Sequence, residues 1–500
     1  MAPAEYTSHV SSASPISRAV GRWTLAAFVA AGAMTARSAE ASEVGDAAAP
    51  RALTIRRIRI TGREQVSERQ IRSVLRDEGV VAGAEILWPE DPRIEAVRDR
   101  LRATGYFKRV TLRLEIVDDA PDEMVLVVDL AERSSVTVSS FHLGSSKMTP
   151  FRGGLAMDER NLLGRAIHLG GGFIWGTRPR IERARRQQGY NVHIEAPRLG
   201  SAPLGVHGGA WFLSASEPYR VDGAENDPDP ALFRAYDYDR IGGVFGLSFP
   251  LSSRLSLDAG YRFERVNAFL PESAAWVRPD GTTQDVSLDM RDGAHRHTAG
   301  QFGLIWDGRD EVFLAGQGGR FALDLQASSF AVGSQYEYIK IVAGGGYSFR
   351  LPWRHWITPI ATGGQIAGDA PRFERFYSGD LSAWTPGREQ GLRYSTRNPI
   401  DVFGSGIDTR EYGNLFGRFD LEYAWPLFRR QRTRLVYGGD LVISTGVFTL
   451  AGDRRERARR REAGQRVAPV GFNADVGLRL DTAIGTFNVT VGNVLRRTPL

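Results

Sequence analysis

The chain has 500 residues, of which 42% are hydrophobic, with a formal net charge of +6 and no cysteine. No apolar run approaches the roughly 20 residues that a membrane-spanning helix needs, and without cysteine there is no disulfide framework and no thiolate metal site. The mean hydropathy of -0.27 does not exclude a membrane β-barrel, because its lipid-facing residues alternate with polar ones.

Residues 1–41 are predicted to be an export signal. An apolar run, WTLAAFVAAGAM, follows two arginines, and AEA at 39–41 has the small-x-small pattern of a cleavage site. The mature chain would then begin near Ser42. The alternative interpretation of the apolar run is a buried helix, but nothing around it could cover such a helix.

Residues 52–132 are predicted to form a small α+β domain in the order strand, helix, helix, strand, strand. LTIRRIRI at 53–60 alternates apolar and polar residues around a one-residue slip at Arg56-Arg57. Two segments with i, i+3, i+4 apolar spacing follow, one capped by Ser67 and one starting after Asp91-Pro92. The two closing strands are expected at 109–117 and 123–130.

Between the second helix and its following strand, the sequence GYFKRV changes the period from 3.6 to 2. This junction, at Gly105, Tyr106 and Phe107, together with the element order, resembles a POTRA domain. The resemblance implies a periplasmic domain whose edge strands accept an extended client segment by β-augmentation. The alternative is a structural α+β module that binds no client.

From about residue 134 to residue 500 the chain alternates on a two-residue period. In 254–264 and again in 472–481, apolar side chains fall on one face and polar ones on the other, over about ten residues. Strands of a soluble sandwich are usually shorter, whereas about nine to eleven residues cross a bilayer at a steep tilt. Short turns also alternate with long polar loops, such as 267–297 and 370–412. The pattern predicts a transmembrane antiparallel β-barrel of about 16 strands.

Several segments, in their order along the chain, resemble the BamA/TamA family of outer-membrane assembly proteins, also called bacterial surface antigen proteins. DERNLLGRAIHLGGGF at 158–173 resembles the turn between the second and third strands of that family's barrel. The Asp-x-Arg-Asp pattern of Asp307, Arg309 and Asp310 resembles its fourth periplasmic turn. The other similar segments are FERFYSGDLSAWTPGREQGLR, NLFGRFDLEYAWPL and VGLRLDTAIGTFNVTVG.

The sequence departs from this family at two places. The family's sixth loop carries an Arg-Gly-aromatic tripeptide whose arginine meets an acidic residue of the barrel wall, whereas this chain has Pro-Gly-Arg-Glu at 386–389. Arg388 is the candidate arginine and Asp440 its candidate partner; the alternative is a solvated loop arginine. The last strand is expected at 486–494, as the fifteenth, with no closing aromatic strand. Either two strands are merged in this count, or the seam is weak, or the barrel is incomplete.

Other chemistry finds little support in the sequence. It has no nucleotide-binding, zinc-protease or serine-hydrolase motif, and His295 and His297 are expected to be a solvated loop pair. The arginine runs RARRQQ and DRRERARRREAGQR indicate solvated or headgroup-facing loops rather than a nucleic-acid groove. We therefore expect no enzyme activity, no cofactor, no metal and no nucleic-acid partner.

The expected protein lies in the outer membrane of a Gram-negative-type cell, with its N-terminal domain in the periplasm. Its expected function is the insertion or translocation of client polypeptides, with lipids and with periplasmic chaperones or accessory lipoproteins as further partners. One alternative is a passive pore lined by inward residues such as Asp258, Arg262, Asp475 and Arg479; another is a two-partner-type secretion transporter for one dedicated client. The sequence does not name the client or decide between protein and lipid cargo.

Overall fold

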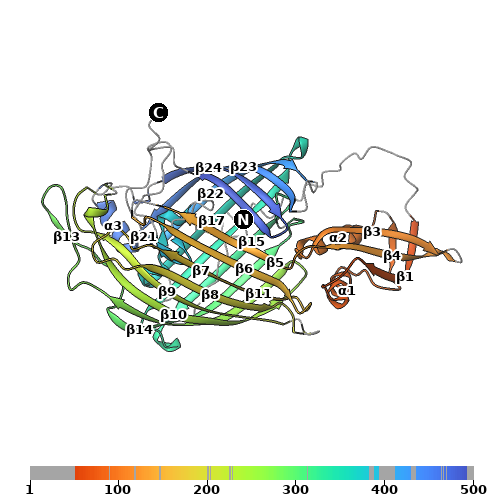
Figure 1. The fold of residues 1–500 in the computed structure, drawn as a ribbon, viewed down its shortest axis with the longest axis horizontal. Helices are drawn as coiled ribbons and strands as arrows, with labels where there is room; N and C mark the ends of the chain where they lie inside the picture. The colour runs from red at the N-terminus through yellow and green to blue at the C-terminus, as the bar shows by residue number, and fades with distance from the viewer. Residues whose placement is uncertain are drawn as a thin grey trace.

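The computed structural model describes residues 51–492 except 89, 118–119, 146–147, 200–201, 203, 225–226, 228, 312, 382–387, 394–411, 430–434, 463, 465–466 and 469. The predicted export signal lies outside the described residues. Figure 1 shows a small N-terminal domain beyond one end of a large barrel. We call this the proximal end of the barrel and the opposite one the distal end.

The N-terminal domain is a four-stranded sheet with two helices. Its strands lie in the order β2-β1-β4-β3, and β1 and β4 are parallel. One hydrophobic core, which includes Ile55, Leu75, Val97 and Leu126, joins the sheet to both helices. The elements are β1 (Arg51–Thr61), α1 (Glu68–Asp77), β2 (Glu85–Trp88), α2 (Pro92–Ala103), β3 (Phe107–Val117) and β4 (Ala120–Glu132).

Strand β2 was not predicted from the sequence, because only Ile86 of its four residues is buried and so short a stretch shows no alternation. The predicted slip in β1 is confirmed as a register shift between Ile55 and Arg57. The carboxylate of Asp91 caps α2 by accepting a hydrogen bond from the backbone N–H of Arg93 at 2.9 Å. The side-chain hydrogen bond from the same arginine lowers the pKa of Asp91 to about 2.

The rest of the described chain forms a 15-stranded antiparallel sheet that curls into a nearly closed barrel (Figure 1). Its strands follow one another in chain order from β5 to β25. They are β5 (Val136–Gly144), β6 (Arg152–Leu162), β7 (Ile167–Gly176), β8 (Gln187–Ala196), β9 (Gly205–Arg220), β10 (Phe233–Pro250), β11 (Leu255–Phe269), β14 (Gly293–Asp307), β15 (Gly318–Ser328), β16 (Glu337–Arg350), β17 (Trp356–Asp369), β22 (Leu415–Phe428), β23 (Val436–Ala451), β24 (Val470–Thr482) and β25 (Gly485–Gly492).

Smaller elements lie in the loops at the distal end. They are β12 (Ala275–Val277), β13 (Thr283–Asp285), β18 (Phe376–Tyr377), β19 (Arg388–Glu389), β20 (Leu392–Arg393), β21 (Tyr412–Gly413) and helix α3 (Arg454–Glu462). None of the helices in the described part of the chain is long and apolar enough to cross a membrane.

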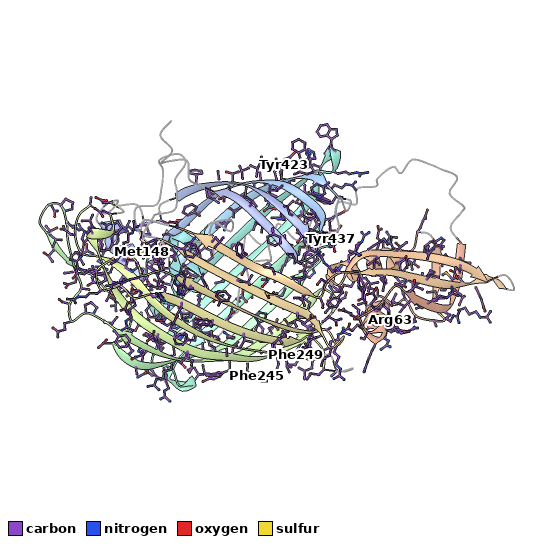
Figure 2. The ribbon with its side chains drawn as sticks, in the orientation of Figure 1. Arg63, Met148, Phe245, Phe249, Tyr423 and Tyr437 are labelled. Carbon is purple, nitrogen blue, oxygen red and sulfur yellow. The ribbon has the colours of Figure 1, made fainter. Side chains whose placement is uncertain are left out.

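The barrel is polar inside and apolar outside. On β11, Arg262 and Glu264 are 2% and 3% exposed, whereas Phe263 between them is 53% exposed. Figure 2 labels Phe245 and Phe249 on the outer face of β10. A soluble sandwich would bury the apolar face, so this arrangement fits a sheet whose outer face meets lipid and whose ladder closes on itself.

The two histidines of the predicted loop pair are not solvated, so that prediction is wrong. They lie on β14, which begins at Gly293 inside the stretch that was expected to be a loop. His297 is 0% exposed, and its ring nitrogens contact Glu264 at 3.0 Å and the hydroxyl of Tyr338 at 2.7 Å. Because the two histidines are two residues apart on a strand, both point into the barrel.

Candidate functional site: the seam and the proximal junction

The two end strands of the sheet, β5 and β25, face each other across a gap in the ladder, which we call the seam. Every other neighbouring pair is joined by a ladder of paired residues, with a register shift in four of these pairs. Strands β9 and β10, for example, form a continuous register from Arg220↔Phe233 to Gly205↔Ser248. Across the seam the described residues form no such register. One backbone hydrogen bond joins its proximal end, from the N–H of Val138 to the carbonyl of Ile484 at 2.6 Å. The seam is therefore the weakest line in the wall.

Gly485 lets the two sides of the seam approach at this point. Its φ is +134°, and a Cβ built on it would lie 2.3 Å from the carbonyl oxygen of Val138. No other residue fits there without moving one strand, because backbone atoms on both sides occupy the space. The turn between β24 and β25 is thus shaped to touch β5.

Arg133 fastens the proximal end of the seam from inside. Its guanidinium donates to Asp481 at 2.7 Å and to the carbonyl of Thr482 at 3.0 Å, and its side chain is 3% exposed. The same guanidinium lies over the ring of Phe313, 3.8 Å from its centroid. Tyr437, at 5.4 Å, is the second ring under this cation (labelled in Figure 2). An arginine just before the first barrel strand therefore holds the end of β24, the strand that pairs with β25.

The predicted turn motif lies between β14 and β15 at the proximal end. Asp307 accepts two hydrogen bonds from Arg309, at 2.9 and 2.7 Å, which tighten the start of the turn. The backbone N–H of Asp310 donates to the carbonyl of Gln317 at 3.0 Å across it. Burial, with the carboxylates of Asp99 and Glu311 nearby, raises the pKa of Asp310 to about 6. The structure thus brings all three predicted turn residues together.

This turn places Phe313 where the N-terminal domain meets the barrel. A Cβ on Gly105, which has φ +73°, would lie 3.2 Å from that ring, so glycine allows the close approach. Tyr106 donates its hydroxyl to the carbonyl of Arg160 at 3.3 Å, near the end of β6. The carbonyl of Tyr106 accepts the N–H of Arg133 at 2.9 Å. Of the predicted junction, Gly105 and Tyr106 contact the barrel, and Phe107 is buried in the domain core.

The predicted pair of Arg388 and Asp440 is wrong. Arg388 donates to Asp380 at 2.7 Å within its own loop and to the carbonyl of Phe373 at 3.3 Å. Asp440 is 0% exposed near the proximal end, where it pairs with Arg429 and accepts the N–H of Ala315 at 2.9 Å. The two residues belong to opposite ends of the barrel. Arg429 directly follows β22, and Asp440 lies near the start of the next strand, β23. Pairing these two strands as a hairpin in the sequence could have identified Arg429 as the partner of Asp440.

A different set of residues, missed in the sequence, anchors the loop after β17 inside the barrel. Glu374, 4% exposed, accepts from Arg262 at 2.7 Å and pairs with Lys340 at 3.2 Å. On the same loop, Arg372 lies 3.8 Å from Glu217. The loop therefore contacts the wall through both charges, with its carboxylate Glu374 on wall cations and its Arg372 near the wall carboxylate Glu217. A loop arginine near a wall carboxylate was expected, but with Arg388 and Asp440. Pro386 and Gly387 of the predicted motif lie outside the described residues.

The described residues enclose a cavity in the lumen. It has a volume of about 300 Å³ and lies in the proximal half, lined by β15, β16, β17, the β14–β15 turn and the pair of Arg479 and Glu422. In the described part of the chain, no group of three or more His, Asp or Glu residues is placed to hold a metal ion.

The sequence of the barrel matches a known family. The Omp85 superfamily domain matches residues 161–499. The chain belongs to the Omp85 superfamily. The prediction of BamA/TamA-type membership is confirmed at the level of this superfamily. An Omp85 barrel with this fold lies in the outer membrane.

Two solved structures with TM-scores of 0.53 and 0.50 share the fold of this Omp85 chain, and a third gives a lower score. CdiB from Escherichia coli is 14% identical with a TM-score of 0.53, covering 88% of this chain and 72% of that one. CdiB from Acinetobacter baumannii is 11% identical with a TM-score of 0.50, covering 88% and 70%. BamA from Haemophilus ducreyi lacking POTRA domains 1–3 is 14% identical with a TM-score of 0.48, covering 89% and 82%.

Proposed function

We propose that this Omp85 protein inserts or translocates client polypeptides by opening the β5–β25 seam and pairing a client strand with its edges. The observation that carries the proposal is the single described backbone hydrogen bond across the seam, between Val138 and Ile484, whereas a ladder joins each other neighbouring pair of barrel strands. An unpaired backbone group in lipid costs several kcal/mol. An open edge supplies partners for a client strand and removes that cost.

The N-terminal domain fits the role of a periplasmic client receptor of the POTRA type. Its sheet has two edge strands, of which β2 has four residues and β3 eleven. Strand β3 pairs only with β4 among the described residues, so its other edge can accept an extended segment by β-augmentation. Because β3 begins directly after the junction at Tyr106, a client there would be held next to the seam. Export, periplasmic chaperones and accessory lipoproteins belong to the same proposal, as does the absence of enzymatic chemistry.

The loop inside the lumen argues against the passive-pore alternative. Arg262, a candidate lining residue, is paired with Glu264 and Glu374 and is 2% exposed. We therefore expect a low single-channel conductance in planar bilayers. A large and steady conductance, with normal assembly of other outer-membrane proteins after depletion, would favour the pore. A defect confined to one secreted protein would favour the dedicated transporter.

A disulfide across the seam tests the proposed function. The chain has no cysteine, so Val138→Cys with Ile484→Cys creates one bond that closes the gap. The matched control is Phe245→Cys with Tyr261→Cys, which joins directly opposite residues of β10 and β11. In proteoliposomes, the seam-locked protein should stop inserting a client barrel and recover on reduction, while the control inserts normally. Full insertion by the locked protein would refute the proposal.

A further inference from the structure

The loop between β7 and β8 carries five arginines within residues 177–186. It lies at the distal end of the barrel, and Met148, which packs against it, is labelled there in Figure 2, far from Arg63 of the N-terminal domain. In the orientation of the proposed function, this end faces the cell exterior. The arginine run was singled out in the sequence, and the seam does not account for it.

The loop has a fixed shape. Ile181 and Ala184 are 5% and 4% exposed and pack with Met148 and Phe233. The backbone N–H of Arg180 donates to the carbonyl of Met148 at 2.7 Å. The arginine side chains therefore project from a rigid base, and ordering them at a ligand costs less than it would in a flexible loop.

Two of the five arginines lie near a carboxylate, one of the barrel wall and one of the loop itself. Arg185 pairs with Asp237 at 2.9 Å, and Arg183 lies 4.0 Å from Glu182. Glu182 is also held by Arg234 at 2.7 Å. The inward side of the loop is thus close to neutral.

The remaining three arginines, Arg178, Arg180 and Arg186, are exposed and have no carboxylate partner among the residues that the structure describes. Arg186 lies over the ring of Trp175, 5.2 Å from its centroid. Trp175 in turn contacts Phe151, with 6.1 Å between the ring centroids.

The position of these rings identifies the surroundings of the three cations. Trp175 shares the outward face of β7 with Phe173, which is 47% exposed, whereas Ile174 between them is buried. Tryptophan rings on the lipid face of a barrel mark the boundary between acyl chains and headgroups. Arg186 therefore sits at headgroup level, and the other two arginines lie in the loop beyond it.

We propose that Arg178, Arg180 and Arg186 bind the phosphate groups of an anionic, phosphorylated lipid in the outer leaflet. A guanidinium makes two parallel hydrogen bonds to phosphate, and three of them around one headgroup match its charge. The acyl chains of that lipid would lie along Phe173 and Trp175. The site rests on the proposed orientation in the membrane but not on seam opening.

The second arginine run provides a control of matched charge. Helix α3 carries exposed arginines at 454, 455, 459 and 461. No aromatic ring lies under these four side chains in the described part of the chain, and the helix is in the loop between β23 and β24. Removing three of these charges lowers the net charge equally without touching the ring at the lipid boundary.

Native mass spectrometry of the full chain in detergent, titrated with lipid A, phosphatidylglycerol or phosphatidylcholine, tests the site. We expect the wild type to retain lipid A in preference to the other two. Arg178→Gln/Arg180→Gln/Arg186→Gln should weaken its retention at least tenfold, since each cation near a lipid surface is worth about fivefold. Arg454→Gln/Arg455→Gln/Arg459→Gln should change it less than about twofold.

Three outcomes would overturn the site. The first is an equal loss of lipid A in both triple variants, which would mean a general charge effect. The second is unchanged retention in the Arg178/Arg180/Arg186 variant with an unchanged melting temperature. The third is displacement of lipid A by inorganic pyrophosphate at similar concentration, which would mean a soluble anion rather than a lipid. None of these readouts depends on client insertion, so a failure here leaves the proposed function separately testable.

Discussion

The wall at β9–β11 and the seam at β5–β25 belong to one sheet but are held in different ways. At β9–β11 long registers are backed by buried ion pairs, such as Arg240 with Glu264 at 2.6 Å. At the seam, the two sides are joined by the close approach of Gly485 to Val138, by one backbone hydrogen bond and by the hydrogen bond of Arg133 to Asp481. The described contacts are therefore dense around most of the circumference and sparse along one line.

The largest expected loss of stability follows from a substitution in the wall at β9–β11. Glu264→Leu leaves Arg240, Arg262 and His297 buried without their shared carboxylate. Loss of one partner of a buried ion pair costs about 3–5 kcal/mol. Urea unfolding followed by heat-modifiable gel mobility should show this loss in the free energy of unfolding. Phe263→Leu, on the lipid face of the same strand, is the control and should cost less than about 1.5 kcal/mol.

Removing the ion pair of Arg133 and Asp481 should weaken the seam without affecting the rest of the wall. Asp481→Asn removes the charge that Arg133 meets at 2.7 Å, and hydrogen bonds to charged groups are worth about 1.5–3 kcal/mol. We expect faster hydrogen exchange at Val138 and more frequent opening in planar bilayers, with no change at β10. Faster exchange in β10 as well would show that the residue supports the whole barrel rather than the seam.

A smaller effect is expected where the seam strands touch. Gly485→Ala would place a Cβ 2.3 Å from the carbonyl oxygen of Val138, at a φ of +134°. Strain of this kind costs about 1–3 kcal/mol. The seam should part at its proximal end, so a spin-label pair on β5 and β24 should show a longer distance. Gly464→Ala, at a φ of +68° with nothing near its Cβ position, controls for backbone strain without a clash; an equal effect there would contradict the account.

The smallest expected effect is a pH dependence of the free energy of unfolding, caused by Asp310 at the proximal junction. The pKa of Asp310 is raised from 3.8 to about 6, so the folded state holds a proton that the unfolded state has lost across this range. The free energy of unfolding therefore falls as the pH rises from about 4 to 6. Asp310→Asn should remove this dependence and raise the melting temperature more at pH 7.5 than at pH 5. Asp453→Asn, in a distal loop, should alter neither.

The sequence predicted which side chains of the barrel strands face lipid, but it did not predict which charged residues pair inside the barrel. Two-residue alternation at 254–264 and 472–481 is a local property, so it identified which side chains face lipid before any strand was placed. The pairing of Arg388 with Asp440 failed because it joins parts of the chain about 50 residues apart. In a chain this rich in arginine, neither spacing nor composition distinguishes Asp380 from Asp440 as the partner. Glu374 was missed for the same reason, since Arg262 lies more than 100 residues before it.

Hydrogen exchange of the intact chain in lipid nanodiscs shows whether the β5–β25 seam is the weak line of the barrel. We expect the seam-facing amides of β5 and β25 to exchange at least about 100-fold faster than the amides of β9 and β10, because a ladder holds only the latter. Locking Val138→Cys to Ile484→Cys should bring the two rates together. Equal protection of all four strands in the unlocked protein would contradict the account.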